Sequence, residues 1–210
     1  MIRLGLIDYG MGNLHSVRRA FERLGAEVLT VADPGADGAL IESCRGLVLP
    51  GVGAFDPAME RLRASGLDRM LGRWCAQGKP LLGICLGLQL LFEASDEGQS
   101  RGLALLPGRV RALPRRRGHP IPHMGWEPLV PLQASPLLPA NAAEAWVYFV
   151  HSFAAEPSDP AIATAGVDFA GDTVTAAVWS GAVGACQFHP EKSGQAGAAI
   201  LRRWLQWLPA

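Results

Sequence analysis

The stretch Pro80-Leu81-Leu82-Gly83-Ile84-Cys85-Leu86-Gly87-Leu88-Gln89-Leu90-Leu91-Phe92 decides the fold of this chain. It opens with a short apolar run, which is typical of a strand that is buried on both faces of a sheet. The leucine-rich residues after Cys85 favour a helix. One glycine lies two residues before Cys85 and another two residues after it, as a sharp strand-to-helix turn requires, because side chains beside such a turn collide. The pattern predicts a nucleophile elbow with cysteine in place of serine.

The predicted elbow gives Cys85 the surroundings of a reactive thiol. It places the sulfur at the N-terminus of a helix, where the helix dipole and free N–H groups favour the thiolate. The backbone N–H of Leu86 would point at the oxyanion that forms when the sulfur attacks a carbonyl group. An inert alternative exists, since buried cysteines often serve as small apolar residues, and we read Cys44, Cys75 and Cys186 in that way.

A second motif, His189-Pro190-Glu191, lies far along the chain. Pro190 biases His189 towards an extended conformation, in which residues two apart point the same way. We therefore expect the Glu191 carboxylate to hold one ring nitrogen of His189 and to leave the other for Cys85. His-Pro-Glu alone is a common loop tripeptide, but together with the elbow it supplies a nucleophile, a base and an orienting carboxylate.

Strand and helix signals alternate in the first half of the chain, which predicts an α/β fold with an open, mainly parallel sheet flanked by helices. The strands expected there are residues 2–7, 27–31, 46–49 and 81–84. In the second half, proline and glycine separate short runs that predict additional antiparallel strands at residues 110–113, 146–150, 161–165 and 173–179. Residues 182–188 form a further strand that delivers His189. Residues 197–208 show helical spacing, and we read their tryptophans as core residues.

Length and composition exclude several function classes. The 210 residues are 49% hydrophobic and 18% charged with zero net charge, so we expect one globular domain over residues 1–210 and no nucleic-acid partner. Arg115–Arg117, the one basic run, has the flanks of a solvated loop. No apolar run approaches the roughly 18 residues of a membrane span, and no signal peptide is evident, so a cytoplasmic location is expected. The cysteines lack paired spacing, and we predict no metal, disulfide framework or cofactor.

Six blocks of sequence resemble the class I (triad) glutamine amidotransferases and, among them, the glutaminase subunits of imidazole glycerol phosphate synthases. The elbow and His-Pro-Glu are typical of the whole superfamily. The narrower resemblance is carried by the other four blocks, Asp8–Leu14, Leu49–Phe55, Pro122–Trp126 and Tyr148–Phe153, and with the elbow and Phe188–Ser193 the resemblance spans essentially the entire chain. It implies a flavodoxin-like three-layer fold, hydrolysis of glutamine to glutamate and ammonia, and a role in histidine biosynthesis.

Residues outside the triad are expected to complete the site. The loop Gly51-Val52-Gly53 follows a strand at the edge of the sheet where α/β sites lie, so it should supply a second oxyanion donor beside Leu86. Its glycines free the peptide between Val52 and Gly53 to rotate, and the resemblance implies that this N–H turns into the site on activation. Gln89 lies one helical turn after Cys85, on the same face of the expected helix. It is either a solvated helix residue or, as the resemblance implies, a residue that binds substrate glutamine together with Ser152 and Phe153.

The resemblance also implies a protein partner that receives the ammonia. This would be a cyclase subunit with a (β/α)8 barrel, which forms a heterodimer with the chain and makes imidazole glycerol phosphate and an aminoimidazole carboxamide ribotide. The implied interface residues are Asn13, Met124, Trp126, Tyr148 and Lys192. The chain departs from the family pattern at Glu127 and Phe153, where asparagine and tyrosine are common.

Two alternatives stay open on the sequence. One is another triad enzyme of the superfamily, a γ-glutamyl hydrolase or a glutaminase that serves a different pathway. It shares Cys85 and His189 but leaves the block around Trp126 unexplained. The other is a regulatory subunit without catalysis, against which the intact triad argues. His151, which closes a predicted strand, is interpreted as a hydrogen-bonded structural residue.

Overall fold

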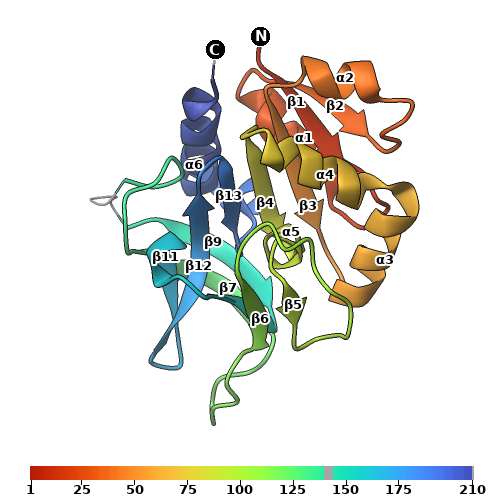
Figure 1. Ribbon diagram of the computed structural model, residues 1–210. Helices are drawn as coiled ribbons and strands as arrows, with labels where there is room; N and C mark the ends of the chain where they lie inside the picture. The colour runs from red at the N-terminus through yellow and green to blue at the C-terminus, as the bar shows by residue number, and fades with distance from the viewer. Residues whose placement is uncertain (140–143, 210) are drawn as a thin grey trace.

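An eight-stranded sheet forms the centre of the computed structural model, which describes residues 1–139 and 144–209 (Figure 1). Its order is β2-β1-β3-β4-β13-β12-β11-β8. The first five strands run parallel, and the last three are added by antiparallel pairing. The bounds are β1 Arg3–Ile7, β2 Glu27–Val31, β3 Gly46–Gly51, β4 Leu81–Cys85, β8 Val130–Pro131, β11 Ala163–Phe169, β12 Asp172–Ser180 and β13 Val183–Cys186. The predicted fold class is confirmed.

Helices cover both faces of this sheet, as the βαβ rhythm predicts (Figure 1). On one face lie α1 (Leu14–Arg23) and α6 (Gly194–Trp207), which bury Phe21 and Trp204 against each other. On the other lie α2 (Gly38–Ser43), α3 (Phe55–Ser65), α4 (Leu67–Ala76) and the short α5 (Leu86–Leu90). The three layers bury the central strands completely, which explains their unbroken apolar runs.

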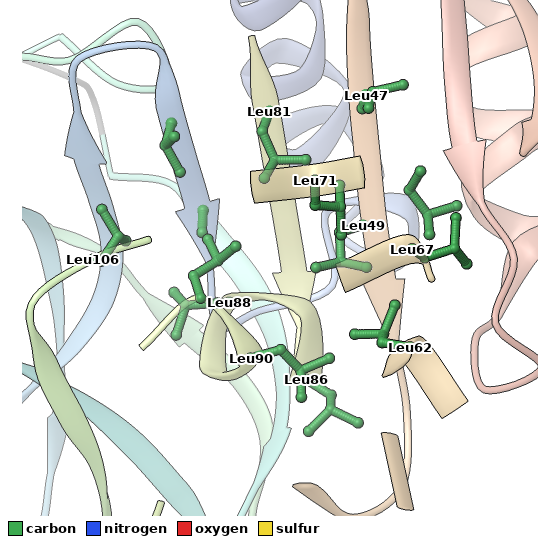
Figure 2. Close-up of a cluster of buried hydrophobic side chains, with 14 of the residues drawn as sticks. Leu47, Leu49, Leu62, Leu67, Leu71, Leu81, Leu86, Leu88, Leu90 and Leu106 are labelled. Atoms are coloured by element: carbon green, nitrogen blue, oxygen red, sulfur yellow. The ribbon is translucent and has the colours of Figure 1, made fainter. Parts of the chain in front are cut away.

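Alternating side chains of the strands divide the core between the two faces. Leu47 and Leu49 of β3 point towards α3 and α4, whereas Val48 between them joins the core under α1 and α6. Figure 2 shows Leu47 and Leu49 beside Leu81 of β4, surrounded by leucines of the neighbouring helices. Truncating one buried leucine to alanine typically lowers the stability of a protein by about 2–5 kcal/mol. The packing of these leucines therefore contributes strongly to holding β3 and β4 side by side.

The second half of the chain adds two small sheets. One joins β5 (Ala94–Ser95), β6 (Gly108–Ala112) and β10 (Phe153–Pro157). The other pairs β7 (His123–Pro128) with β9 (Trp146–His151) in antiparallel register. The strands predicted at residues 110–113 and 146–150 therefore exist, but they pair away from the central sheet.

Several element boundaries differ from the sequence prediction. Helices α2 and α3 and strands β5, β7, β8 and β10 were not predicted. The strand expected at residues 161–165 begins only at Ala163, because the 3-10 helix η1 (Pro160–Ile162) precedes it and the Asp159 carboxylate caps its N-terminus. Helix α5 ends at Leu90, earlier than expected.

The core prediction is wrong for Trp207, which is 36% exposed and packs edge-on against Trp179. It is also wrong for Cys75, which is only partly buried, while Cys44 and Cys186 are buried as expected. Arg115–Arg117 is exposed, and Arg116 pairs with Asp172.

Two kinds of feature are missing from the described residues. Over residues 1–139 and 144–209, none of the helices combines the length and the apolar character needed to cross a bilayer. In the same part of the chain, His, Cys, Asp and Glu side chains do not gather into a group of three that could bind a metal ion.

Candidate active site

Cys85 ends β4 and stands on the predicted sharp turn into α5. Its φ of 56° lies in the left-handed region, which a non-glycine residue occupies only under strain. The turn presses α5 against β3, so that a Cβ atom at Gly87 would overlap the carbonyl oxygen of Leu49. A Cβ at Gly83 would lie 2.9 Å from the carbonyl oxygen of Gly87. The elbow geometry therefore needs both glycines, as the sequence argument expects.

His189 and Glu191 form the predicted pair. The Nδ1 atom of His189 lies 2.8 Å from Oε1 of Glu191, and both side chains are almost fully buried. His189 itself is extended, as expected before Pro190, but residues Pro190–Lys192 form a 3-10 turn, η2, so the chain reaches this contact by a different route from the one expected. Since a carboxylate only accepts, Nδ1 donates to Glu191, which leaves Nε2 as the nitrogen available for chemistry.

Cys85 and Glu191 together set the charge of His189. Burial alone lowers the pKa of the imidazole, but the interactions with Cys85 and with Glu191 reverse the sign and raise it to about 9. Nε2 of His189 is buried and makes no hydrogen bond of standard geometry within the described residues. In other cysteine nucleophiles, an imidazolium beside the sulfur favours the reactive thiolate.

Cys85 and His189 open into a cavity of about 310 Å³. A volume of that size suits a small metabolite. The expected substrate contacts Gln89, Ser152 and Phe153 all line it. The complete lining is Val52, Gly53, Cys85, Leu86, Gln89, Glu97, Pro122, Val150, His151, Ser152, Phe153 and His189.

The glycine-containing loop lies directly beside the nucleophile. Strands β3 and β4 pair in parallel with Gly51 opposite Cys85, so Val52 and Gly53 leave the sheet at the mouth of the cavity. Gly53 has a φ of +97°, which favours glycine, and the Val52 side chain is exposed. The structure thus brings together every residue that the sequence assigns to the oxyanion hole.

Gln89 is buried, so its interpretation as a solvated helix residue is wrong. Its amide nitrogen donates to the carbonyl oxygen of Phe153 and to Oε1 of Gln187, at 3.0 Å in each case. These bonds hold the side chain in the wall of the cavity.

Three residues near the cavity were missed as site candidates: Glu97, Gln187 and, as a cavity wall, His151. Glu97 accepts the backbone N–H of Phe55 at 2.9 Å, and burial raises the pKa of its carboxyl group. Burial lowers the pKa of His151 to about 4, and its ring contacts Phe153 O and His123, which confirms a hydrogen-bonded structural residue. No spacing in the sequence links Glu97 to Cys85, since only the packing of the loop against α3 brings it there.

The expected interface residues fall largely on one surface. Met124 and Trp126 on β7 are 61% and 49% exposed. Trp126 pairs with Tyr148 across β7 and β9, and Nζ of Lys192 lies 5.9 Å from the Tyr148 ring. The backbone carbonyl oxygen of Tyr148 also accepts a hydrogen bond of 2.9 Å from the backbone N–H of His189. Asn13 comes from a different element, the loop before α1.

Comparison with known proteins gives a consistent result. Residues 5–207 match the family described as "Glutamine amidotransferase class-I". The chain is 56% identical to "Imidazole glycerol phosphate synthase subunit HisH" of Synechococcus sp. (strain CC9605), covering 99% of this chain and 95% of the relative. It is 55% identical to "Imidazole glycerol phosphate synthase subunit HisH 2" of Parasynechococcus marenigrum (strain WH8102), covering 99% and 96%.

Solved structures share the fold at low sequence identity. "Structure of PurLQS from Thermotoga maritima" superposes with a TM-score of 0.75 at 21% identity, covering 99% of each chain. "Crystal structure of glutamine amidotransferase" superposes with a TM-score of 0.74 at 19% identity, covering 97% of each chain.

Proposed function

This chain belongs to the class-I glutamine amidotransferase family, and we propose that it releases ammonia from glutamine as the HisH-type subunit of an imidazole glycerol phosphate synthase in histidine biosynthesis. The observation that carries the proposal is the bond between His189 and Glu191 behind a strained Cys85 at one cavity. We propose further that residues 1–210 act as one amidotransferase domain, which the match over residues 5–207 supports.

In the proposed reaction, the Cys85 sulfur attacks the γ-carbonyl carbon of glutamine and forms a tetrahedral oxyanion. The carbon–nitrogen bond then breaks as protonated His189 gives its Nε2 proton to the leaving nitrogen, which departs as ammonia. Water attacks the resulting thioester, with His189 now taking a proton, and glutamate leaves as the sulfur is released. Glu191 keeps Nδ1 protonated and stabilises the imidazolium in both steps.

The oxyanion needs donors that are in place before it forms. We assign one to the backbone N–H of Leu86, at the start of α5. The second is the N–H of Gly53, after rotation of the Val52–Gly53 peptide. Gly53 lines the same cavity as Cys85, and Gly51, two residues before it, lies opposite Cys85 in the β3–β4 register, which supports this assignment.

The cavity also suits the amino-acid end of glutamine. Glu97 places a carboxylate in the lining, where it can pair with the α-ammonium group of the substrate. Gln89, Ser152 and Phe153 line the remaining wall, and we assign the recognition of the substrate to these groups. The phenylalanine at position 153 contributes its backbone carbonyl to Gln89.

For the partner, we propose a cyclase subunit with a (β/α)8 barrel that forms a heterodimer with this chain in the cytoplasm. Its docking surface would contain Met124, Trp126, Tyr148, Lys192 and Asn13. Exposed tryptophan and methionine are enriched at protein interfaces. Tyr148 supports a link to the site, because it contacts the exposed Trp126 and bonds to the backbone of His189.

An enzyme of the same superfamily that acts alone, such as a γ-glutamyl hydrolase, is the weaker candidate. It would use Cys85 and His189 equally well. It offers no reason for the exposed Met124 and Trp126 so near the triad.

The test measures ammonia release from glutamine by the chain alone, with a cyclase subunit, and with that subunit and its nucleotide substrate. We expect a nearly inactive chain that the liganded partner switches on. Cys85→Ala should abolish release in the activated complex without weakening complex formation, whereas Cys186→Ala should retain most activity. Substantial release by Cys85→Ala contradicts the assigned nucleophile, and an equally active lone chain contradicts the gated partnership.

A further inference from the structure

Gln187 lies directly behind the nucleophile and has no part in the steps above. It follows β13, two residues before His189, and is completely buried, at 0% exposure. Its backbone N–H donates to the carbonyl oxygen of Ala176 at 2.8 Å, which anchors it to β12. A buried amide normally has partners for its polar atoms, so those partners indicate what it does.

The side chain of Gln187 bridges two residues of the cavity wall. Its Oε1 accepts a hydrogen bond of 3.0 Å from Nε2 of Gln89, and its Nε2 donates to the sulfur of Cys85 at 3.9 Å. The second contact is long, but a sulfur is a large acceptor and both groups are buried, where electrostatic interactions are strong.

Neighbouring groups fix which way the Gln187 amide points. The carbonyl oxygen of Phe153 can only accept, so the NH2 group of Gln89 must face it at 3.0 Å. The second hydrogen of that NH2 group then faces Gln187, which must present its oxygen. The remaining end of Gln187, its own NH2 group, is left facing Cys85.

We propose that Gln187 is a positioning residue that holds the sulfur of Cys85 in the elbow and stabilises its thiolate by donating a hydrogen bond, with Gln89 fixing the direction of the donor. The inference rests on the proposed function, in which Cys85 reacts as a thiolate. A donor to the charged form of a group favours that form. Gln89 also lines the substrate cavity, so the amide that contacts glutamine is the one that aims the donor at the nucleophile.

The test is the rate at which iodoacetamide alkylates Cys85 as a function of pH, followed by mass spectrometry of the Cys85 peptide. Gln187→Met keeps the length of the side chain and removes the donor. It should move the midpoint of the rate–pH curve up by about one unit and slow alkylation at neutral pH roughly tenfold. Gln187→Glu places a carboxylate beside the sulfur and should move the midpoint further in the same direction.

Gln133→Met is the control for the chemical exchange itself, at an exposed residue whose amide donates to the carbonyl oxygens of Ala161 and Ala163. It should leave the Cys85 curve unchanged. Gln89→Met provides a second variant in case Gln187→Met does not fold. It keeps Gln187 but removes the group that orients it, and should move the midpoint upwards by a smaller amount.

The outcomes separate the two proposals. If Cys85 alkylates faster than Cys44 and Cys186 but its curve is the same in the wild type, Gln187→Met and Gln89→Met, the positioning role is wrong and the nucleophile stands. If Cys85 in the wild type is no more reactive than the buried thiols at any pH, the proposed function itself fails.

Discussion

The hydroxyl group of Tyr9 donates a 2.9 Å hydrogen bond to the carbonyl oxygen of Pro50, in the buried interior of the protein. Tyr9 follows β1, and Pro50 is the residue of β3 from which the loop Gly51-Val52-Gly53 departs. Burial raises the pKa of the Tyr9 hydroxyl, so it stays a donor at all ordinary pH values. This bond ties the N-terminal segment to the base of the loop to which we assign an oxyanion donor.

We predict that Tyr9→Phe lowers the free energy of unfolding by about 0.5–1.5 kcal/mol, the usual contribution of one hydrogen bond. It should also reduce glutamine hydrolysis by the activated complex severalfold, because the base of the loop is released. Denaturant unfolding and ammonia release measure the two effects. Tyr148→Phe is the control for stability, because the Tyr148 hydroxyl makes no hydrogen bond to the described residues.

Gly53→Ala should depress the partner-stimulated rate much more than it depresses stability. With φ at +97°, an alanine there costs about 1–2 kcal/mol, and it restricts rotation of the Val52–Gly53 peptide. One oxyanion donor is worth roughly a hundred- to a thousandfold in rate, so we expect a loss of at least tenfold. Gly25→Ala is matched to it in backbone conformation, with φ at +87°, although the Cβ position of Gly25 is open and that of Gly53 lies 2.9 Å from the flexible end of the Met11 side chain.

Rate measurements on the liganded complex and unfolding curves of both glycine variants decide this prediction. Gly25→Ala should lose comparable stability and keep its activity, since it lies between α1 and β2. Equal activity in the two variants would mean that the loop does not gate the reaction.

Glu191→Gln should lower the free energy of unfolding more at pH 6 than at pH 9.5. The folded-state pKa of His189 is about 9, above its ordinary value of 6.5, so its protonated form adds stability that is complete below pH 6.5 and is lost as the pH rises through 9. Removing the carboxylate removes part of that contribution. Urea unfolding of the wild type and of Glu191→Gln at the two pH values tests this prediction. A loss of unfolding free energy that is larger at pH 9.5 than at pH 6 would contradict the assigned interaction.

His189→Ala should remove nearly all glutamine hydrolysis, a loss of roughly 10²–10⁴-fold. Glu191→Gln should cost less, because an amide still holds the ring although it cannot stabilise its charge. Ammonia release by the liganded complex measures both losses. Equal and mild losses in the two variants would mean that the triad is misassigned.

Lys192→Ala should weaken the response to the partner while leaving the triad intact. Lys192 is exposed beside the Tyr148 ring and directly follows Glu191, so a partner carboxylate could pair with it. We expect about a fivefold loss in partner stimulation or affinity, in keeping with one exposed ion pair. Lys79, the other lysine of the chain, lies over Trp74 in the same kind of contact, and Lys79→Ala should change neither quantity.

The elbow could be read from the sequence because its requirements are local. A turn as tight as the one at Cys85 leaves no room for side chains two residues away, so glycine at both positions indicates the geometry directly. The parallel strands could also be predicted from the sequence, since burial on both faces of the sheet requires unbroken apolar runs such as Leu81–Ile84.

The contact between His189 and Glu191 was predicted correctly from two residues in one motif, but by the wrong route. His189 and Glu191 are so close in sequence that either an extended segment or a 3-10 turn can bring them together. Which of the two forms depends on the packing of η2 against α6, where a Cβ at Gly197 would overlap Pro190. Local preference alone does not contain that contact.

Tertiary structure alone decided which other side chains reach the site. Glu97 enters the neighbourhood of Cys85 from a loop and Gln187 from the segment after β13, and no periodicity in the chain relates them to Cys85. The burial of Trp204 and Trp207 in α6 also depended on tertiary structure. Residues three apart lie within about 60° of each other on a helix, so spacing treats both as buried. Only the surface against which α6 packs determines that Trp204 is enclosed while Trp207 lies at the edge beside Trp179. Periodicity in the sequence predicts which face of a helix or strand is apolar. Which elements pack against that face is determined by contacts between distant parts of the chain.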